Sequence, residues 1–157
     1  MVSERVRQLD HRGWSLAELL VVIAVIAILA AISIPLFITY LQSSTVRAGA
    51  QEMRTALNQA KQLAITRRQN ICVQPVGNGF QFQPNACGSA PLIMPGTDGT
   101  GTFRVQNNVA VTVSAGNVAP VFTPLGAAAP AGQLTVTGPA GNALTVTVSG
   151  AGRITTP

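Results

Sequence analysis

The feature that most constrains this chain is an apolar run over residues 16–38 that contains one charged side chain, Glu18. As a helix rising about 1.5 Å per residue, the run is about as long as the roughly 30 Å hydrocarbon core of a bilayer is thick. A plain membrane anchor or an uncleaved signal peptide accounts for this length, but neither accounts for the acid. A carboxylate at the centre of a membrane helix costs about 2.5–3.5 kcal/mol on insertion scales. We therefore expect Glu18 to have a function and a cationic partner, of which an α-amino group made by cleavage after Gly13 is the leading candidate.

The residues around this acid follow a known pattern. Arg12 and Gly13 precede the aromatic Trp14, and Glu18 is the fifth residue counted from Trp14. This pattern closely resembles the leader of type IV pilins and of the pseudopilins of type II secretion. The resemblance implies that a prepilin peptidase cuts between Gly13 and Trp14, that Trp14 becomes the N-methylated terminus, and that Glu18 pairs with the terminus of a neighbouring subunit during filament assembly. Pro35 falls where these proteins commonly carry a helix-loosening proline, whereas Trp14 stands where they usually have Phe.

The same resemblance implies four segments: a cleaved leader at 1–13, a transmembrane and assembly helix at 14–40, an amphipathic helix extension at 41–70 and a β-rich domain at 71–157. The leader is rich in arginine, and basic residues stay on the cytoplasmic side of a membrane. We therefore expect a single-pass inner-membrane protein with its C-terminal domain in the periplasm, which joins a filament when assembled. Charged residues make up only 10% of the chain, which suits an exported Thr/Val-rich sheet better than a cytosolic enzyme.

The apolar run continues into an amphipathic stretch that ends near Arg68. Pro35 and Gly49 weaken a helix, so we expect one long but bendable helix. Arg67 and Arg68 oppose the negative end of the helix dipole, and Asn70 suits the left-handed cap position. One face should pack on the domain that follows, because apolar residues step along it by three and four. These residues are Val46, Ala50, Met53, Leu57, Ala60 and Ala64.

The same stretch carries four cations spaced seven residues apart, Arg47, Arg54, Lys61 and Arg68. Seven residues are nearly two helical turns, so the four side chains form one stripe. One interpretation is a track for DNA phosphates or anionic head groups, which requires only positive charge at regular intervals. The other interpretation, which we favour, is that the stripe is simply the solvent-exposed side of the helix next to the face that packs on the domain.

Beyond residue 70 the hydrophobic period changes to two, which is typical of strands. The loop Gly77-Asn78 suits positive φ angles and predicts an antiparallel hairpin of 72–76 with 79–83. In the register that this loop sets, Val73 faces Phe82. The alternation of apolar and polar residues on both strands then puts the apolar ones on one face of the sheet.

Further strands are expected in the second half of the chain. A hairpin would join 103–105 to 109–111 through a loop in which Asn108 takes the left-handed conformation. Pro75 argues that the first hairpin lies at the edge of a sheet. Apolar residues alternating with Thr predict the remaining strands, at 120–123, 134–137, 144–149 and around 153–154.

The C-terminal part is similar to a narrower family. Residues 121–126 (Val-Phe-Thr-Pro-Leu-Gly) and 148–154 (Val-Ser-Gly-Ala-Gly-Arg-Ile) resemble the end of the domain shared by the type II secretion minor pseudopilin GspH and the minor pilin FimT. The resemblance implies an α+β pseudopilin fold, with a long N-terminal membrane-spanning helix packed by its C-terminal half on a small antiparallel β-sandwich. Some FimT-type members bind DNA through a C-terminal Gly-Arg-x-Arg. Here Gly152 and Arg153 match but Thr155 replaces the second Arg, which weakens the DNA interpretation because each lost phosphate contact removes a counterion-release contribution.

Cys72 and Cys87 are the only cysteines. In an oxidising exterior we expect them to form one disulfide, worth about 3 kcal/mol for a loop of this size in the chain-entropy model. A metal site is the alternative, and it would need more ligands than the lone His11, which lies in the leader. After leader removal the acids are Glu18, Glu52 and Asp98, and without a histidine or a paired nucleophile they offer no acid–base catalysis. We therefore expect no catalytic residue, no cofactor and no metal.

These features together predict a minor pseudopilin, a structural near-tip subunit of a type II secretion pseudopilus that takes part in protein export. Its partners would be other pilins or pseudopilins through the N-terminal helix, the prepilin peptidase, the inner membrane and secreted proteins. The alternative is a FimT-like minor type IV pilin that acts in pilus initiation or in DNA uptake by natural transformation. DNA is the less favoured ligand, with Arg153 and the four cations of the stripe as its candidate contacts.

Overall fold

A computed structural model describes residues 15–106 and 108–156. The predicted cleavage and methylation residues, Gly13 and Trp14, lie outside these ranges. The chain divides after Ile38 into two units, and each is described by itself. The elements in chain order are α1 (Leu16–Arg67), β1 (Ile71–Val76), β2 (Gly79–Pro84), β3 (Thr102–Arg104), β4 (Ala110–Val113), β5 (Val121–Phe122), β6 (Gly132–Thr137), β7 (Ala143–Val148) and β8 (Ile154–Thr155).

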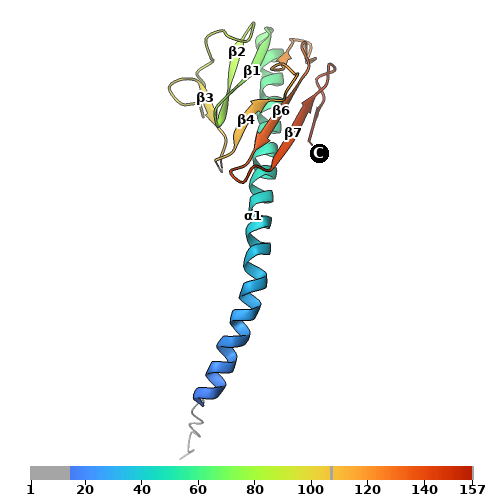
Figure 1. Cartoon of the computed structure of the whole chain (residues 1–157). Helices are drawn as coiled ribbons and strands as arrows, with labels where there is room; N and C mark the ends of the chain where they lie inside the picture. The colour runs from blue at the N-terminus through green and yellow to red at the C-terminus, as the bar shows by residue number, and fades with distance from the viewer. Residues whose placement is uncertain (1–14, 107, 157) are drawn as a thin grey trace, which may run out of the picture. The chain divides into compact units, whose positions relative to one another are not determined.

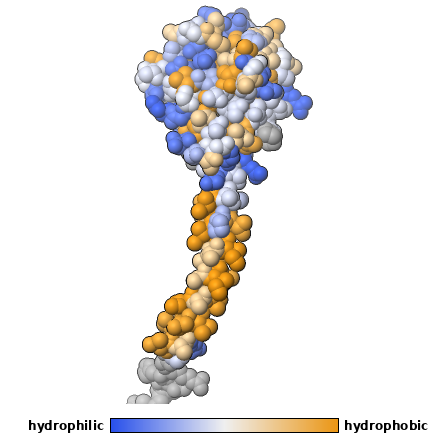
Figure 2. All heavy atoms as spheres, viewed as in Figure 1, coloured by the Kyte–Doolittle hydropathy of each residue, from blue (hydrophilic) through white to orange (hydrophobic). Residues whose placement is uncertain are grey.

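The described part of the first unit is the N-terminal half of α1. Its large hydrophobic side chains, from Leu16 to Ile38, are exposed, and Figure 2 shows them as a nearly continuous hydrophobic surface. The helix is long and apolar enough to cross a membrane. Pro35 lies inside it, where the missing N–H removes one backbone hydrogen bond without ending the helix. Exposed apolar surface of this extent is typical of a segment that contacts a membrane or other proteins.

The second unit contains two four-stranded sheets, with strand orders β3-β2-β1-β5 and β4-β6-β7-β8 (Figure 1). All the strand pairs are antiparallel, so the expected α+β fold with a β-sandwich is confirmed. The hairpin of β1 and β2 has the expected register, with Val73 opposite Phe82. Its turn begins at Gly77, which has a φ of +59°. The expected strands at 134–137 and 144–149 are also present, as β6 and β7, which pair with Leu134 opposite Val146.

The second expected hairpin is wrong, because β3 and β4 belong to different sheets. β3 pairs with β2, which brings Phe103 opposite Phe80, and the two rings stack with centroids 5.4 Å apart. β4 pairs with β6, which brings Val111 opposite Val136 in the core. Asn108, in the connection, has the expected positive φ of 53°. The loop therefore carries the chain from one sheet to the other, and packing of the flanking side chains decides the pairing.

Pro75 does not mark an edge strand, because β1 lies between β2 and β5. Val73 donates its N–H to the carbonyl oxygen of Pro120 at 3.0 Å, on the side away from β2. Hydrogen-bonding direction alternates along an antiparallel strand, so the nitrogen of Pro75 faces the same side. β5 pairs only with Ile71 and Cys72 and has ended before that point. The proline therefore removes no ladder hydrogen bond, which explains how an inner strand accepts it.

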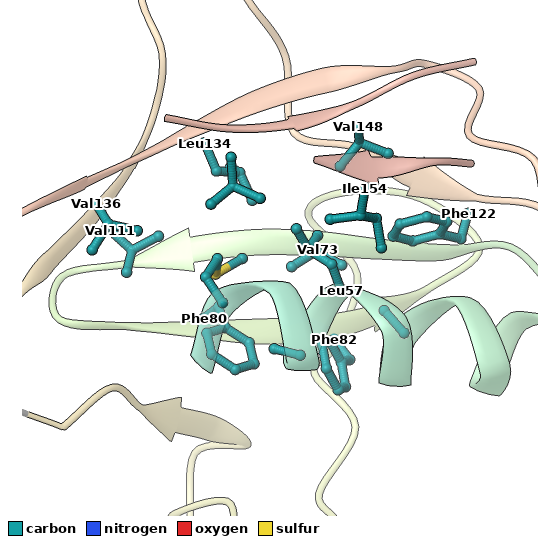
Figure 3. Packing of buried hydrophobic residues seen from close by; sticks show 14 of the residues in the cluster. Leu57, Val73, Phe80, Phe82, Val111, Phe122, Leu134, Val136, Val148 and Ile154 are labelled. Atoms are coloured by element: carbon teal, nitrogen blue, oxygen red, sulfur yellow. The ribbon is translucent and has the colours of Figure 1, made fainter. Parts of the chain in front are cut away.

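The core lies between α1 and the two sheets. The expected helix face, from Val46 to Ala64, is buried, and Figure 3 shows Leu57 of α1 among side chains from both sheets. Gly49 belongs to this face. A Cβ there would lie 2.9 Å from Cγ2 of Val109 and 3.1 Å from Cγ1 of Val136. Gly49 therefore lets the sheet approach the helix, in addition to its expected effect on helix stiffness.

The helix ends in a way that corrects the expected cap. Arg68, not Asn70, takes the left-handed conformation, with a φ of 52°. The N–H of Arg68 donates a hydrogen bond to the carbonyl oxygen of Ile65 at 3.4 Å. The N–H of Gln69 donates one to the carbonyl oxygen of Ala64 at 3.3 Å. These two bonds form a Schellman motif, which satisfies the last free carbonyls of the helix.

Candidate assembly and interaction sites

The N-terminus of α1 is capped by Ser15. Its Oγ accepts a hydrogen bond from the N–H of Glu18 at 3.1 Å, and its carbonyl oxygen accepts the first helical bond, from Leu19, at 3.2 Å. Ser15 is absent from the residues predicted above, although Ser-x-x-Glu before an apolar run is a sequence signal for a helix start. Glu18 is exposed in the first turn, where the helix dipole favours a negative charge. The acid therefore suits the helix start as well as the predicted pairing.

The four cations of the predicted stripe are not equivalent. Arg47, Arg54 and Arg68 are exposed, whereas Lys61 is half-buried. The Nζ atom of Lys61 donates a hydrogen bond to the carbonyl oxygen of Gly152 at 3.0 Å. One member of the stripe is therefore a structural contact between α1 and the C-terminal loop.

The two acids of the second unit are both engaged. Glu52 accepts a hydrogen bond from the N–H of Gln106 at 2.9 Å through Oε2. Asp98 accepts hydrogen bonds from the side chain of Thr100 and from the backbone of Thr102, and Arg104 lies 3.3 Å from its other oxygen. These contacts favour the charged form, the hydroxyl of Thr100 most, and lower the pKa of Asp98 to about 2. Among the described residues, no acid forms an ion pair with the exposed cations of the stripe.

Residues 121–126 and 148–154, which we call the C-terminal signature, meet at a junction with α1. Gly152 has a φ of +72°, and a Cβ on it would collide with the carbonyl oxygen of Gly126. A Cβ on Gly126 would lie 3.1 Å from Cε of Lys61 and 3.3 Å from Cδ1 of Ile65. Close approach of neighbouring atoms therefore explains Gly126 and Gly152, two of the three glycines in these segments. Arg153 follows directly and is exposed.

Comparison with known families gives two matches. The family described as "Type II transport protein GspH" matches residues 49–152, a range that includes the junction and most of the β-sandwich. This chain belongs to the GspH family. The "Prokaryotic N-terminal methylation motif" matches residues 10–34, which include Gly13, Trp14 and Glu18. None of the curated proteins compared with the chain matches it.

Solved structures support the fold of this GspH-family chain. The minor pseudopilin EpsH from the type II secretion system of Vibrio cholerae superposes with a TM-score of 0.53 at 13% identity, covering 71% of this chain and 95% of EpsH. The type IV minor pilin FimU of Pseudomonas aeruginosa superposes with a TM-score of 0.50 at 17% identity, covering 75% of this chain and 92% of FimU. At these identities the likeness concerns the fold, which is shared by pilus and secretion subunits.

The GspH-family domain contains a disulfide between Cys72 and Cys87, whose Cα atoms are 5.2 Å apart. Cys72 is fully buried on β1, and Cys87 lies in the connection that follows β2. The bond therefore ties this connection to an inner strand.

In the part of the chain that the structure describes, no three His, Cys, Asp or Glu side chains gather as a metal site would require. The family is one of structural filament subunits.

Proposed function

We propose that this GspH-family chain is a minor pseudopilin, a structural near-tip subunit of a type II secretion pseudopilus that takes part in protein export without catalysing a reaction. One observation carries the proposal: a methylation motif at 10–34 and a GspH match at 49–152 occur in the same chain. The motif supplies a means of polymerising, and the domain is of a kind found in a minor secretion subunit.

The proposed sequence of events begins in the inner membrane, with the C-terminal domain in the periplasm. A prepilin peptidase cuts between Gly13 and Trp14, and Trp14 is N-methylated. The carboxylate of Glu18 then pairs with the terminal amine of a neighbouring subunit, because an isolated charge is costly in the membrane. Exposed apolar side chains of α1 gain contacts as helices of neighbouring subunits gather. Pro35, which removes one backbone bond, gives the helix freedom to adjust to this packing.

The test separates processing from assembly. Glu18→Ala in the full chain should leave leader cleavage intact and abolish incorporation into sheared filaments, both measured by immunoblotting. Glu52→Gln is the matched control, because it also removes an acid but keeps an acceptor for Gln106; it should assemble like the unaltered chain. Normal assembly of Glu18→Ala would contradict the pairing.

A second function is favoured by one observation. Arg153 is exposed next to the loop that Lys61 contacts, and a minor type IV pilin that acts in pilus initiation or DNA uptake would use such cations on phosphates. Detergent-solubilised full chain, mixed with duplex DNA at rising salt, tests this alternative. Arg153→Ala should weaken binding if the alternative is right, and no binding at low salt would exclude it.

A further inference from the structure

Leu125 is 94% exposed at the tip of a well-held turn. The N–H of Gly126 donates a hydrogen bond to the carbonyl oxygen of Thr123 at 2.9 Å. The N–H of Thr123 donates one to the carbonyl oxygen of Ala127 at 2.8 Å. The turn also rests on α1 through Gly126. A large apolar side chain held out by an ordered turn is unfavourable in water. Packing within the domain does not account for its position.

The surroundings of Leu125 combine apolar and positive groups. Ile65, which touches the position of Gly126, is 46% exposed. Lys61 reaches the same junction and bonds to Gly152, and Arg153 follows Gly152. We call Lys61, Ile65, Leu125 and Arg153 the Leu125 surface.

The charge of the second unit limits what covers this surface. From residue 39 onward the sequence has two acids, Glu52 and Asp98, and both are held by contacts within the domain. A second copy of the domain therefore offers no unengaged acidic side chain to oppose Lys61 or Arg153, and like charges at an interface are repelled. The seven basic residues over the same range are Arg47, Arg54, Lys61, Arg67, Arg68, Arg104 and Arg153.

We propose that the Leu125 surface docks a different pilin-like subunit, one whose domain presents an apolar pocket with carboxylates around it. This inference rests on the proposed function and names a partner class for it. Leu125 enters the pocket, and Lys61 and Arg153 oppose its rim. DNA fits less well, because an exposed Leu and Ile add nothing to phosphate contacts and none of the four side chains is aromatic to stack on a base.

The test uses the full chain in cells that assemble filaments, with a photo-crosslinking amino acid at position 125. We expect a cross-link to another pilin-like subunit with an acidic domain. Arg153→Glu should lower its yield about tenfold, whereas Arg153→Lys should retain it, because the rim contact depends on charge. The matched control is the same cross-linker at Ile93, which is also exposed, at 73%, and lies in the connection between β2 and β3; it should not capture that subunit.

The outcomes distinguish this inference from the function on which it rests. A chain that does not enter filaments at all would overturn both. Three outcomes with normal incorporation would overturn the docking surface alone. They are the absence of any cross-link from position 125, a cross-link only to a second copy of this chain, and a cross-link yield that Arg153→Glu does not change. Loss of duplex DNA binding in Leu125→Asp, with no subunit captured, would assign the surface to nucleic acid instead. Thermal unfolding of each variant checks that the domain remains folded.

Discussion

Lys61 and Gly152, which are 91 positions apart in the sequence, are joined by a hydrogen bond of 3.0 Å from Nζ to the carbonyl oxygen. The bond ties α1 to the loop that precedes β8. It also brings a cation of the helix stripe beside Arg153. One contact thus links the helix, the turn at Gly126 and the C-terminal signature.

Replacing Lys61 tests this link. Lys61→Met keeps most of the apolar stem but removes the donor, so it should destabilise the domain by about 1 kcal/mol, the net value of a typical intramolecular hydrogen bond. Arg54→Met changes an exposed member of the same stripe and should stay within about 0.5 kcal/mol of the unaltered chain. Urea unfolding of the detergent-solubilised chain measures both. Equal effects of the two variants would contradict a structural role for Lys61.

Gly49 tests how closely the helix approaches the sheet. Gly49→Ala improves helix propensity by about 1 kcal/mol, but its Cβ would press on Val109 and Val136, and overpacking costs about 1–3 kcal/mol. We expect net destabilisation in thermal unfolding, and relief when Val109→Ala is added. Gly99→Ala is the control, because no atom beyond its chain neighbours lies within 4 Å of its Cβ position. A more stable Gly49→Ala variant would contradict the tight contact.

Arg68 tests the helix cap. Arg68→Gly removes a side chain from a residue with a φ of 52°, so it should stabilise the domain by about 0.5–1 kcal/mol. Arg67→Gly, one residue earlier and still helical, should destabilise it by about 1 kcal/mol. The opposite signs, measured by urea unfolding, separate cap geometry from loss of charge. Destabilisation by both changes would show that the helix dipole matters more than the backbone conformation.

Asp98 predicts a pH dependence. Its pKa is lowered from 3.8 to about 2 in the folded chain, so the charged form is favoured by folding. The resulting stability is present above about pH 4 and is lost as the pH falls through about 2. Asp98→Asn should therefore be less stable than the unaltered chain at neutral pH, and the difference should shrink over this window. Thermal unfolding at several pH values measures it, and a difference that does not change with pH would contradict the assignment.

Much of the fold was predictable because its signals are local. The buried face of α1 follows from side chains three and four residues apart, and the β1–β2 hairpin follows from the Gly77-Asn78 turn. Ser15 was readable in the same way, since its signal is the spacing to Glu18. In each case the residues that decide the structure are near one another in the chain.

The other features depend on partners that are distant in sequence. Periodicity at 103–105 and 109–111 indicates strands but not which strands they pair with. The stacking of Phe103 on Phe80 favours the pairing of β3 with β2. From the sequence alone, Gly49 indicates only a weaker helix, because the atoms that require a glycine there belong to the distant residues Val109 and Val136. The cap at Arg68 was missed since composition favours Asn in a left-handed position.

The sequence by itself determined the N-terminal segment of this protein, residues 10–38: an apolar run, an acid at its start and a methylation motif are properties of consecutive residues. Only the tertiary structure decided which of the domain's cations lie at the junction of Gly126 and Gly152, next to Leu125 in the chain. Lys61 and Arg153 come together because two glycines allow the backbone at 126 and 152 to approach. The residues next to a glycine in the sequence do not indicate which distant segment packs against it. The proposed assembly role thus follows from neighbouring residues of the sequence, whereas the proposed docking surface exists only in the folded domain.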